Sequence, residues 1–94
     1  MTYQRGETAV LQAYVKDSSG DYVDPSVSIT ITITDPNGNV VVNEQTMSKS
    51  ETGRYYYDYN IPEDATVGRY AYRVEVKDGS PVRTTIEQSS FVVG

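Results

Sequence analysis

The chain contains no cysteine and no histidine among its 94 residues. Without cysteine it cannot form a disulfide, a thiolate nucleophile, a Cys-ligated zinc site or an iron–sulfur cluster. Without histidine it lacks the side chain that serves most often as a general base and as a metal ligand. These two absences exclude most of the side-chain chemistry that enzymes use, so we expect a chain that is not an enzyme and that needs no cofactor.

Concentrated positive charge and long apolar runs are also missing. The net charge is −5, and the eight basic residues are scattered from Arg5 to Arg83. Because nucleic-acid binding needs a concentrated basic face, we expect no nucleic-acid partner. The first five residues lack the apolar core of a signal peptide, and no apolar run approaches a membrane span, so we expect no membrane insertion. The length is that of one domain, residues 1–94.

Two glycine-headed runs, residues 53–61 and 68–76, carry a large apolar or aromatic residue at every second position. Side chains alternate across a strand, so this spacing places rings on one face and polar groups on the other. The strand character extends to six stretches: residues 7–16, 27–34, 40–46, 53–61, 68–76 and 82–93. A seventh, short edge strand is expected at Tyr22. Short strands with turns between them and no helical period predict an antiparallel β-sandwich or small barrel.

The alternation also predicts which residues form the core. The inward-facing set comprises Leu11, Val15, Val27, Ile29, Ile31, Ile33, Tyr57, Tyr70, Tyr72, Val74 and Val76. The strand at residues 27–34 is β-branched, uncharged and free of proline, so we expect it to be paired on both sides. Residues 48–52 are polar and are expected to be a link. Ser89 and Ser90 suggest a bulge or a break in the alternation of the last strand.

The edges of the sheets are expected to carry residues that discourage pairing with another chain. Asp24 and Pro25 would do so near Tyr22, and Pro81 with Arg83 at the start of the last strand. If the chain self-associates, the expected contact is the irregular strand at residues 84–93.

Turn glycines followed by strand aromatics recur in four motifs along the chain. They are Tyr3-x-Arg5-Gly6-Glu7-Thr8, Asp35-Pro36-x-Gly38-x-Val40, Gly53-x-Tyr55 running to Ile61-Pro62, and Gly68-x-Tyr70-x-Tyr72-x-Val74. Together they resemble the immunoglobulin-like modules of the macroglobulin-type (MG2-like) family, and related Ig-like modules of prokaryotic surface proteins and of phage tail or baseplate proteins.

The resemblance implies an all-β fold, an immunoglobulin-like antiparallel β-sandwich of about seven strands. It also implies a non-catalytic structural or interaction module of a larger extracellular or virion assembly, with other protein modules as its partners. The extracellular surface or the virion would then be its location. Residues 64–72 are similar to a tyrosine corner, in which Tyr70 would bond back to the backbone of the corner and Tyr72 would lie in the core.

The candidate ligand or partner surface consists of three tyrosines. Tyr56 points to the face opposite its neighbours, and with Tyr14 and Tyr22 it is predicted to form an exposed aromatic patch. Tyrosine rings stack on sugars and are frequent in binding surfaces, so the alternative function is a small carbohydrate-binding sandwich. Tyr55, Tyr57 and Tyr59 allow the same interpretation, but core packing explains their alternation better.

Acidic residues raise two further hypotheses. Asp17, Asp21 and Asp24 lie in one loop, and Asp35, Asn37 and Asn39 in another, and such loops can supply the oxygens that calcium requires. The spacing is not that of an EF-hand, and Asp and Asn in turns usually bond their own backbone, so we expect no metal. Asp58 and Glu75 are residue types that hydrolyse glycosides in pairs. We expect them instead to be partners of Arg54 and Arg73.

Overall fold

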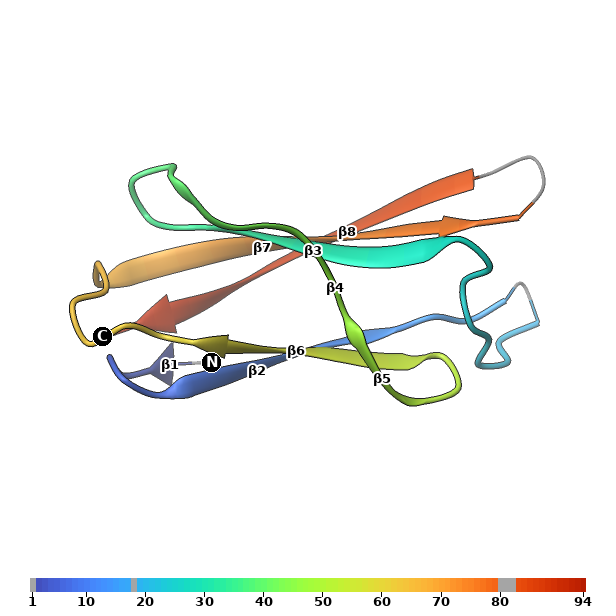
Figure 1. The fold of residues 1–94 in the computed structure, drawn as a ribbon, viewed down its shortest axis with the longest axis horizontal. Coiled ribbons are helices and arrows are strands. Elements are labelled where there is room, and N and C mark those ends of the chain that lie inside the picture. The colour runs from blue at the N-terminus through green and yellow to red at the C-terminus, as the bar shows by residue number, and fades with distance from the viewer. Residues whose placement is uncertain (1, 18, 80–82) are drawn as a thin grey trace.

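The computed structural model describes residues 2–17, 19–79 and 83–94, and in this part it contains eight β-strands and no helix, hence none that could span a membrane. The strands form two sheets packed face to face, which is the predicted all-β sandwich (Figure 1). The strands are β1 (Thr2–Tyr3), β2 (Thr8–Tyr14), β3 (Ser28–Thr34), β4 (Val40–Thr46), β5 (Ser48–Glu51), β6 (Arg54–Asn60), β7 (Gly68–Asp78) and β8 (Arg83–Val93).

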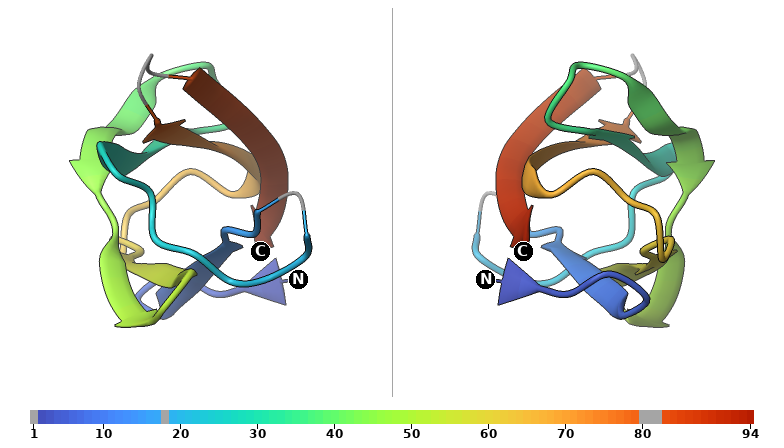
Figure 2. Two further views of the ribbon diagram at one scale, coloured as in Figure 1. Left: turned by 90° about the vertical axis from the view of Figure 1, so that its right-hand side faces the viewer. Right: turned by 90° about the vertical axis from the view of Figure 1, so that its left-hand side faces the viewer.

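The larger sheet has the order β1-β8-β7-β3-β4, and the smaller one the order β2-β6-β5. Every pair is antiparallel except β1 with β8, where Thr2 lies opposite Val92 in a parallel pair. The prediction of an antiparallel sandwich therefore holds for all pairs but this one. Because β1 ends beside the end of β8, the two termini lie close together (Figure 2).

The isoleucines of β3 form the centre of the core. Ile29, Ile31 and Ile33 are at most 4% exposed, while the hydroxyl side chains between them face outward. Burial of each isoleucine removes enough apolar surface to stabilise the fold by roughly 1.5–3 kcal/mol. β3 pairs with β4 on one side and with β7 on the other, so the prediction that this strand is paired on both sides is confirmed.

An aromatic cluster around Phe91 fills the core near the termini. The Phe91 ring stacks on that of Tyr70 at 5.2 Å between centroids, and the ring of Tyr59 lies 6.3 Å from it. The Tyr70 hydroxyl donates a 2.7 Å hydrogen bond to the carbonyl of Thr66, so the predicted tyrosine corner is confirmed. Gly68 begins β7 at φ 134°, where a Cβ would lie 2.9 Å from the Pro36 ring, so glycine is required for this approach.

The first tyrosine-rich run forms β6, which pairs with β2 in the smaller sheet. On the inner face, Ala9 lies opposite Tyr59 and Ala13 opposite Tyr55, so small side chains make room for large ones. Tyr59 is buried, and Tyr55 and Tyr57 are half-buried against the core, as the core interpretation predicts. Tyr56 lies on the outer face, as predicted, but it is half-buried rather than exposed.

The chain changes sheets between β4 and β5, at the single residue Met47. Met47 is buried, and its N–H donates to the carbonyl of Ile29 at 3.1 Å. The expectation that residues 48–52 are only a link is wrong, because Ser48–Glu51 is a strand that pairs with β6. All four residues of β5 are exposed, so this strand lacks the apolar alternation by which strands are found in a sequence.

Three other expectations about the core and the edges are wrong. Val27 is 52% exposed because it lies in the loop before β3. No bulge occurs at Ser89, because the register between β7 and β8 is continuous. Tyr22 forms only an isolated bridge with Lys16 and no edge strand, so Asp24 and Pro25 do not protect such a strand.

Three further predicted core residues, Val15, Tyr72 and Val76, pack against the core but are half-buried. Pro81 lies outside the described residues.

Candidate interaction surface

Tyr14 and Tyr22 come together at the end of the molecule opposite the C-terminus. Tyr14 is the last residue of β2 and points outward, because it follows the buried Ala13. Tyr22 lies in the loop between β2 and β3, and the bridge between Lys16 and Tyr22 brings its ring within 6.3 Å of the Tyr14 ring. The two side chains remain 50% and 39% exposed. The structure thus brings together two of the three predicted surface tyrosines at what we call the loop end.

Two cationic side chains lie against the ring of Tyr22. The Lys16 ammonium is 5.0 Å from the ring centroid, and the Arg54 guanidinium carbon is 4.9 Å from it. Each such contact at an exposed site contributes about 0.5–1 kcal/mol. The ring of Tyr22 is therefore held in place although it lies in a loop. Nothing in the spacing of these residues along the chain indicates the contacts, because they depend on how the loop folds back.

Asp24 anchors the loop that carries Tyr22. Its Oδ2 accepts a 2.6 Å hydrogen bond from the Lys49 ammonium, and its Oδ1 accepts from the N–H of Gly53 at 2.9 Å and from the Tyr55 hydroxyl at 3.0 Å. The hydrogen bond from Lys49, followed by that from Gly53, holds the pKa of Asp24 below its ordinary value. This carboxylate, which the calcium hypothesis placed among possible metal ligands, thus ties the loop to β5 and β6.

Gly53 allows the loop to approach the turn between β5 and β6. It adopts φ 72°, and a Cβ there would lie 2.7 Å from the carbonyl oxygen of Val15 and 2.8 Å from the Cβ of Tyr22. Its own carbonyl accepts a 2.7 Å hydrogen bond from the N–H of Val15. A side chain at this position would push the backbone next to Tyr22 away, so this glycine positions the tyrosine as well as the turn.

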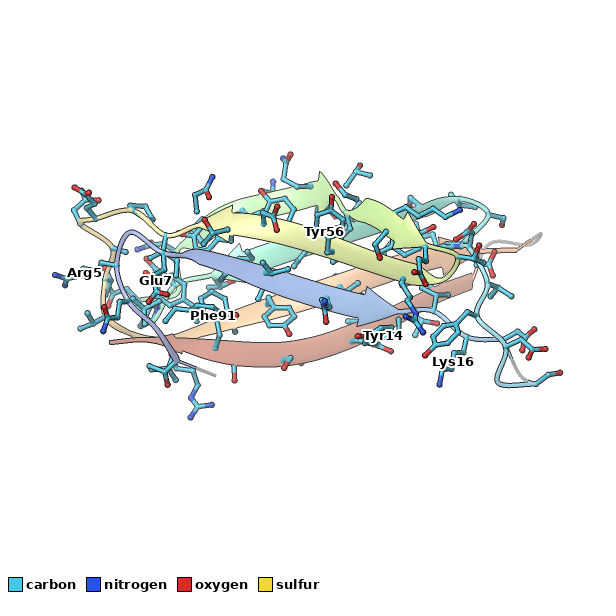
Figure 3. The ribbon with its side chains drawn as sticks, turned by 90° about the horizontal axis from the view of Figure 1, so that it is seen from below. Arg5, Glu7, Tyr14, Lys16, Tyr56 and Phe91 are labelled. Atoms are coloured by element: carbon cyan, nitrogen blue, oxygen red, sulfur yellow. The ribbon has the colours of Figure 1, made fainter. Side chains whose placement is uncertain are left out.

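Tyr56 shares a depression with Tyr14 on the outer face of the smaller sheet. The depression has a volume of about 350 Å³, and Gln12, Arg54 and Asp58 also line it. The Tyr14 hydroxyl donates to Gln12 Oε1 at 3.2 Å. Figure 3 shows Tyr14 and Tyr56 on the same face of the molecule. We call Tyr14, Tyr22 and Tyr56 the tyrosine surface.

The comparison with known families agrees with the fold. The family model of the MG2 domain matches residues 2–93. The chain belongs to the MG2 domain family. This confirms the predicted family and the immunoglobulin-like fold class. A search of the curated proteins finds no match. MG2 domains are generally non-catalytic, so membership indicates a structural or interaction module.

The acidic loops of this MG2 domain use their side chains to bind their own backbone. Asp17 Oδ1 accepts from the N–H groups of Ser19 and Asp21, and Asp35 Oδ1 accepts from those of Asn37 and Asn39, at 2.8–3.0 Å. Within residues 2–17, 19–79 and 83–94, no three acidic side chains lie close enough together to hold a metal ion. The arrangement is that of turns in which the side chain replaces a backbone acceptor.

The paired-carboxylate hypothesis does not fit the MG2 sandwich. Asp58 lies on the outer face of the smaller sheet, opposite Val10, whereas Glu75 lies on the outer face of the larger sheet. Glu75 is next to Arg73 at 3.4 Å and Lys77 at 3.8 Å. The two carboxylates therefore face away from each other on opposite sides of the molecule and cannot act on one bond.

Proposed function

We propose that this MG2 domain is a non-catalytic structural and interaction module of a larger extracellular or virion assembly. Its partner in this proposal is another protein module of the same assembly, which it contacts through the tyrosine surface. Family membership supports the modular role, and the exposed, ordered rings of Tyr14 and Tyr22 at one end of the sandwich support this contact. The extracellular surface or the virion is the proposed location.

The observation that carries the contact is the ordered pair of rings at the loop end. Tyr14 and Tyr22 are 50% and 39% exposed, yet Lys16 and Arg54 fix the ring of Tyr22 and Asp24 fixes its loop. Tyrosine offers a large contact area at a low cost in side-chain entropy. A ring that is already held in place loses even less freedom when a partner binds.

Photo-crosslinking in the native assembly tests this proposal. A photoreactive phenylalanine analogue is placed at Tyr14 or at Tyr56, and at Thr32 on the outer face of the larger sheet as the control. We expect one and the same protein to be crosslinked from Tyr14 and Tyr56 and to be absent from the Thr32 sample. The same product from all three positions, or products from Thr32 alone, would contradict the proposed surface. Fractionation of cells and virions tests the proposed location separately.

A second candidate function, glycan binding, is favoured by the depression between Tyr14 and Tyr56. There, two rings lie beside the amide of Gln12, the guanidinium of Arg54 and the carboxylate of Asp58. Rings that stack on a sugar and polar groups that bond its hydroxyls are the features a carbohydrate site needs.

A glycan array followed by fluorescence titration separates the two functions. Glycan binding predicts saturable quenching of tyrosine fluorescence by one oligosaccharide, which Tyr14→Ala and Tyr56→Ala each abolish. Val41→Ala, at an exposed position of β4, is the control and should leave the quenching unchanged. An array without any signal contradicts glycan binding and leaves the protein-module proposal in place.

A further inference from the structure

The edge of the larger sheet is open along most of β8. β8 pairs with β7 over its whole length, but on its other side β1 covers only Val92 and Val93. Within the described part of the chain, no strand pairs with that side from Arg83 to Phe91. Figure 3 shows β8 along one edge of the molecule. Such an edge presents unpaired N–H and C=O groups to which another strand can add.

The backbone groups on this open side can be assigned. The N–H of Gly94 donates to the carbonyl of Tyr3 in β1 at 2.9 Å, so it points toward the open side of the sheet. Alternate residues of a strand point the same way, and the register of β8 is continuous. The N–H groups of Ile86, Gln88 and Ser90 therefore point outward from the edge, whereas that of Glu87 points to β7.

Glu87 places a negative charge on the inner face beside this edge. It lies opposite the buried Val74, yet it is exposed because no strand of the smaller sheet covers it. Its carboxylate makes no ion pair or hydrogen bond with any described residue. An inward-facing charge at a strand edge discourages pairing with an apolar strand.

A hollow of about 140 Å³ adjoins Glu87, between β8 and the end of β2. Its lining includes Lys16, Val76, Asp78 and Glu87. Lys16 already contacts the ring of Tyr22, and Asp78 accepts a hydrogen bond from the N–H of Ser26 at 2.8 Å. The hollow therefore holds two carboxylates and one ammonium, and Glu87 is the group without a partner among the described residues.

We infer that the open edge of β8 is a strand-addition site for an extended segment of a partner protein that carries a lysine or arginine opposite Glu87. Backbone hydrogen bonds to Ile86, Gln88 and Ser90 would supply affinity, and the basic side chain in the hollow would supply selectivity. A second copy of this chain fits less well, because the chain has a net charge of −5 and residues 84–93 contain no basic side chain. This inference does not depend on the tyrosine surface.

Nuclear magnetic resonance with two designed peptides tests the inference. Both are short threonine–valine strands, one with a central lysine and the other with a central glutamate. At about 1 mM peptide, which suits weak binding, we expect slower hydrogen exchange at the amides of Ile86, Gln88 and Ser90 in the intact chain. The lysine peptide should bind about three- to fivefold more tightly, as expected for an exposed ion pair. No slowing with either peptide, or tighter binding of the glutamate peptide, would overturn the inference.

Two variants separate the backbone from the charge. Gln88→Pro removes an outward N–H without breaking the ladder to β7, so it should abolish the slowing at Ile86 and Ser90. Glu87→Gln leaves the backbone of the edge unchanged and removes the charge, so the two peptides should bind equally to it. This test remains valid even if the proline variant does not fold. Unequal binding to Glu87→Gln would overturn the role of Glu87. If sedimentation shows that the chain dimerises without peptide and the same amides exchange slowly in that dimer, the partner is a second copy of this chain. That result would overturn the choice of a different protein as partner.

Discussion

Near the termini, tyrosines are buried around Phe91, whereas at the loop end they lie at the surface beside Lys16 and Arg54. Tyr70 is 2% exposed and its hydroxyl is bonded to a backbone carbonyl, while Tyr14 is 50% exposed. Tyr14 and Tyr70 come from strands with the same alternation of side chains, whereas Tyr22 lies in a loop. The contrast shows that residue type does not decide the role of a tyrosine in this domain. A strand tyrosine is buried when its position in the alternation points it inward and the other sheet covers it.

β6 shows this contrast within a single strand. Tyr55, Tyr57 and Tyr59 face the core side, and Tyr56 between them faces outward. The Tyr55 hydroxyl reaches Asp24 at the loop end, so one inward tyrosine also supports the loop that carries Tyr22. The buried cluster therefore accounts for stability, and the surface tyrosines are available for contacts.

The largest expected effect comes from removing a ring on the buried side. Tyr70→Ala should lower the free energy of unfolding by about 3–5 kcal/mol, because it leaves a cavity beside Phe91. Tyr14→Ala, the matched surface change, should lower it by no more than about 0.5 kcal/mol. Urea denaturation of both variants measures the difference. Equal losses would contradict the division into buried and surface tyrosines.

Ile31→Ala sharpens the comparison on β3, where no aromatic ring is involved. We expect a loss of about 2–5 kcal/mol, since Ile31 is fully buried. Thr30→Ala, one residue earlier on the outer face, should change stability by no more than about 1 kcal/mol. A loss at Ile31 below half a kcal/mol in urea denaturation would mean that the register is inverted and that the threonines face inward.

The sequence was sufficient for the parts of the fold in which alternation and turn chemistry agree. β3, β6 and β7 alternate cleanly between glycine- or proline-containing turns, and the tyrosine corner at Tyr70 follows from its local motif. Inward residues in these strands are covered by the opposite sheet, so apolar side chains are required at every second position. In these strands the alternation in the sequence and the packing of the two sheets require apolar residues at the same positions.

The sequence was insufficient at the edges, where the other sheet does not cover the inner face. In β8, Thr85, Glu87 and Ser89 occupy inward positions at the open end, so the alternation is visible only at Phe91 and Val93. Phe91 was therefore not predicted as the centre of the aromatic cluster. β5 was missed for the same reason, because all of its residues are exposed.

The candidate site followed the same division. The alternation of side chains identified Tyr14 and Tyr56 as outward-facing, and the structure places them in one depression. The contacts of Tyr22 with Lys16 and Arg54, and the anchor at Asp24, depend on the path of the loop. Long-range contacts of this kind leave no periodic signal in the chain.

Tyr70→Phe should lower the free energy of unfolding less than the alanine variant, by about 1–2 kcal/mol, because the carbonyl of Thr66 loses its donor.

The same variant should also change how stability depends on pH under alkaline conditions. Burial raises the pKa of Tyr70 above its ordinary value of 10.0. The stability of the folded state is therefore full below pH 10 and falls as the pH rises above it, since the unfolded chain loses its proton first. Urea denaturation at several alkaline pH values should show a shallower fall for Tyr70→Phe than for the wild type. An unchanged slope would contradict the role of this hydroxyl.

Asp24→Asn tests the anchor at the loop end, where we expect a smaller effect. The hydrogen bond from Lys49 lowers the pKa of Asp24 from its ordinary value of 3.8. The stabilisation is therefore present above pH 3.8 and is lost as the pH falls through the lower folded-state value. Thermal unfolding between acidic and neutral pH should show a weaker acid dependence for Asp24→Asn than for the wild type. An acid dependence in Asp24→Asn equal to that of the wild type would contradict the role of this anchor.

The smallest expected effect is that of a chelator, which compares the acidic loops at the two ends. Asp17 at the loop end and Asp35 near the termini each accept two backbone N–H groups, so their turns form without a cation. We expect EDTA to leave the melting temperature unchanged. A calcium ion bound at a hundredfold excess over its dissociation constant would stabilise the fold by about 2.7 kcal/mol. A drop of several degrees with EDTA, reversed by calcium and abolished by Asp17→Asn but not by Asp35→Asn, would show that the loop next to Tyr22 binds a cation. The tyrosine surface would then depend on an ion as well as on Asp24.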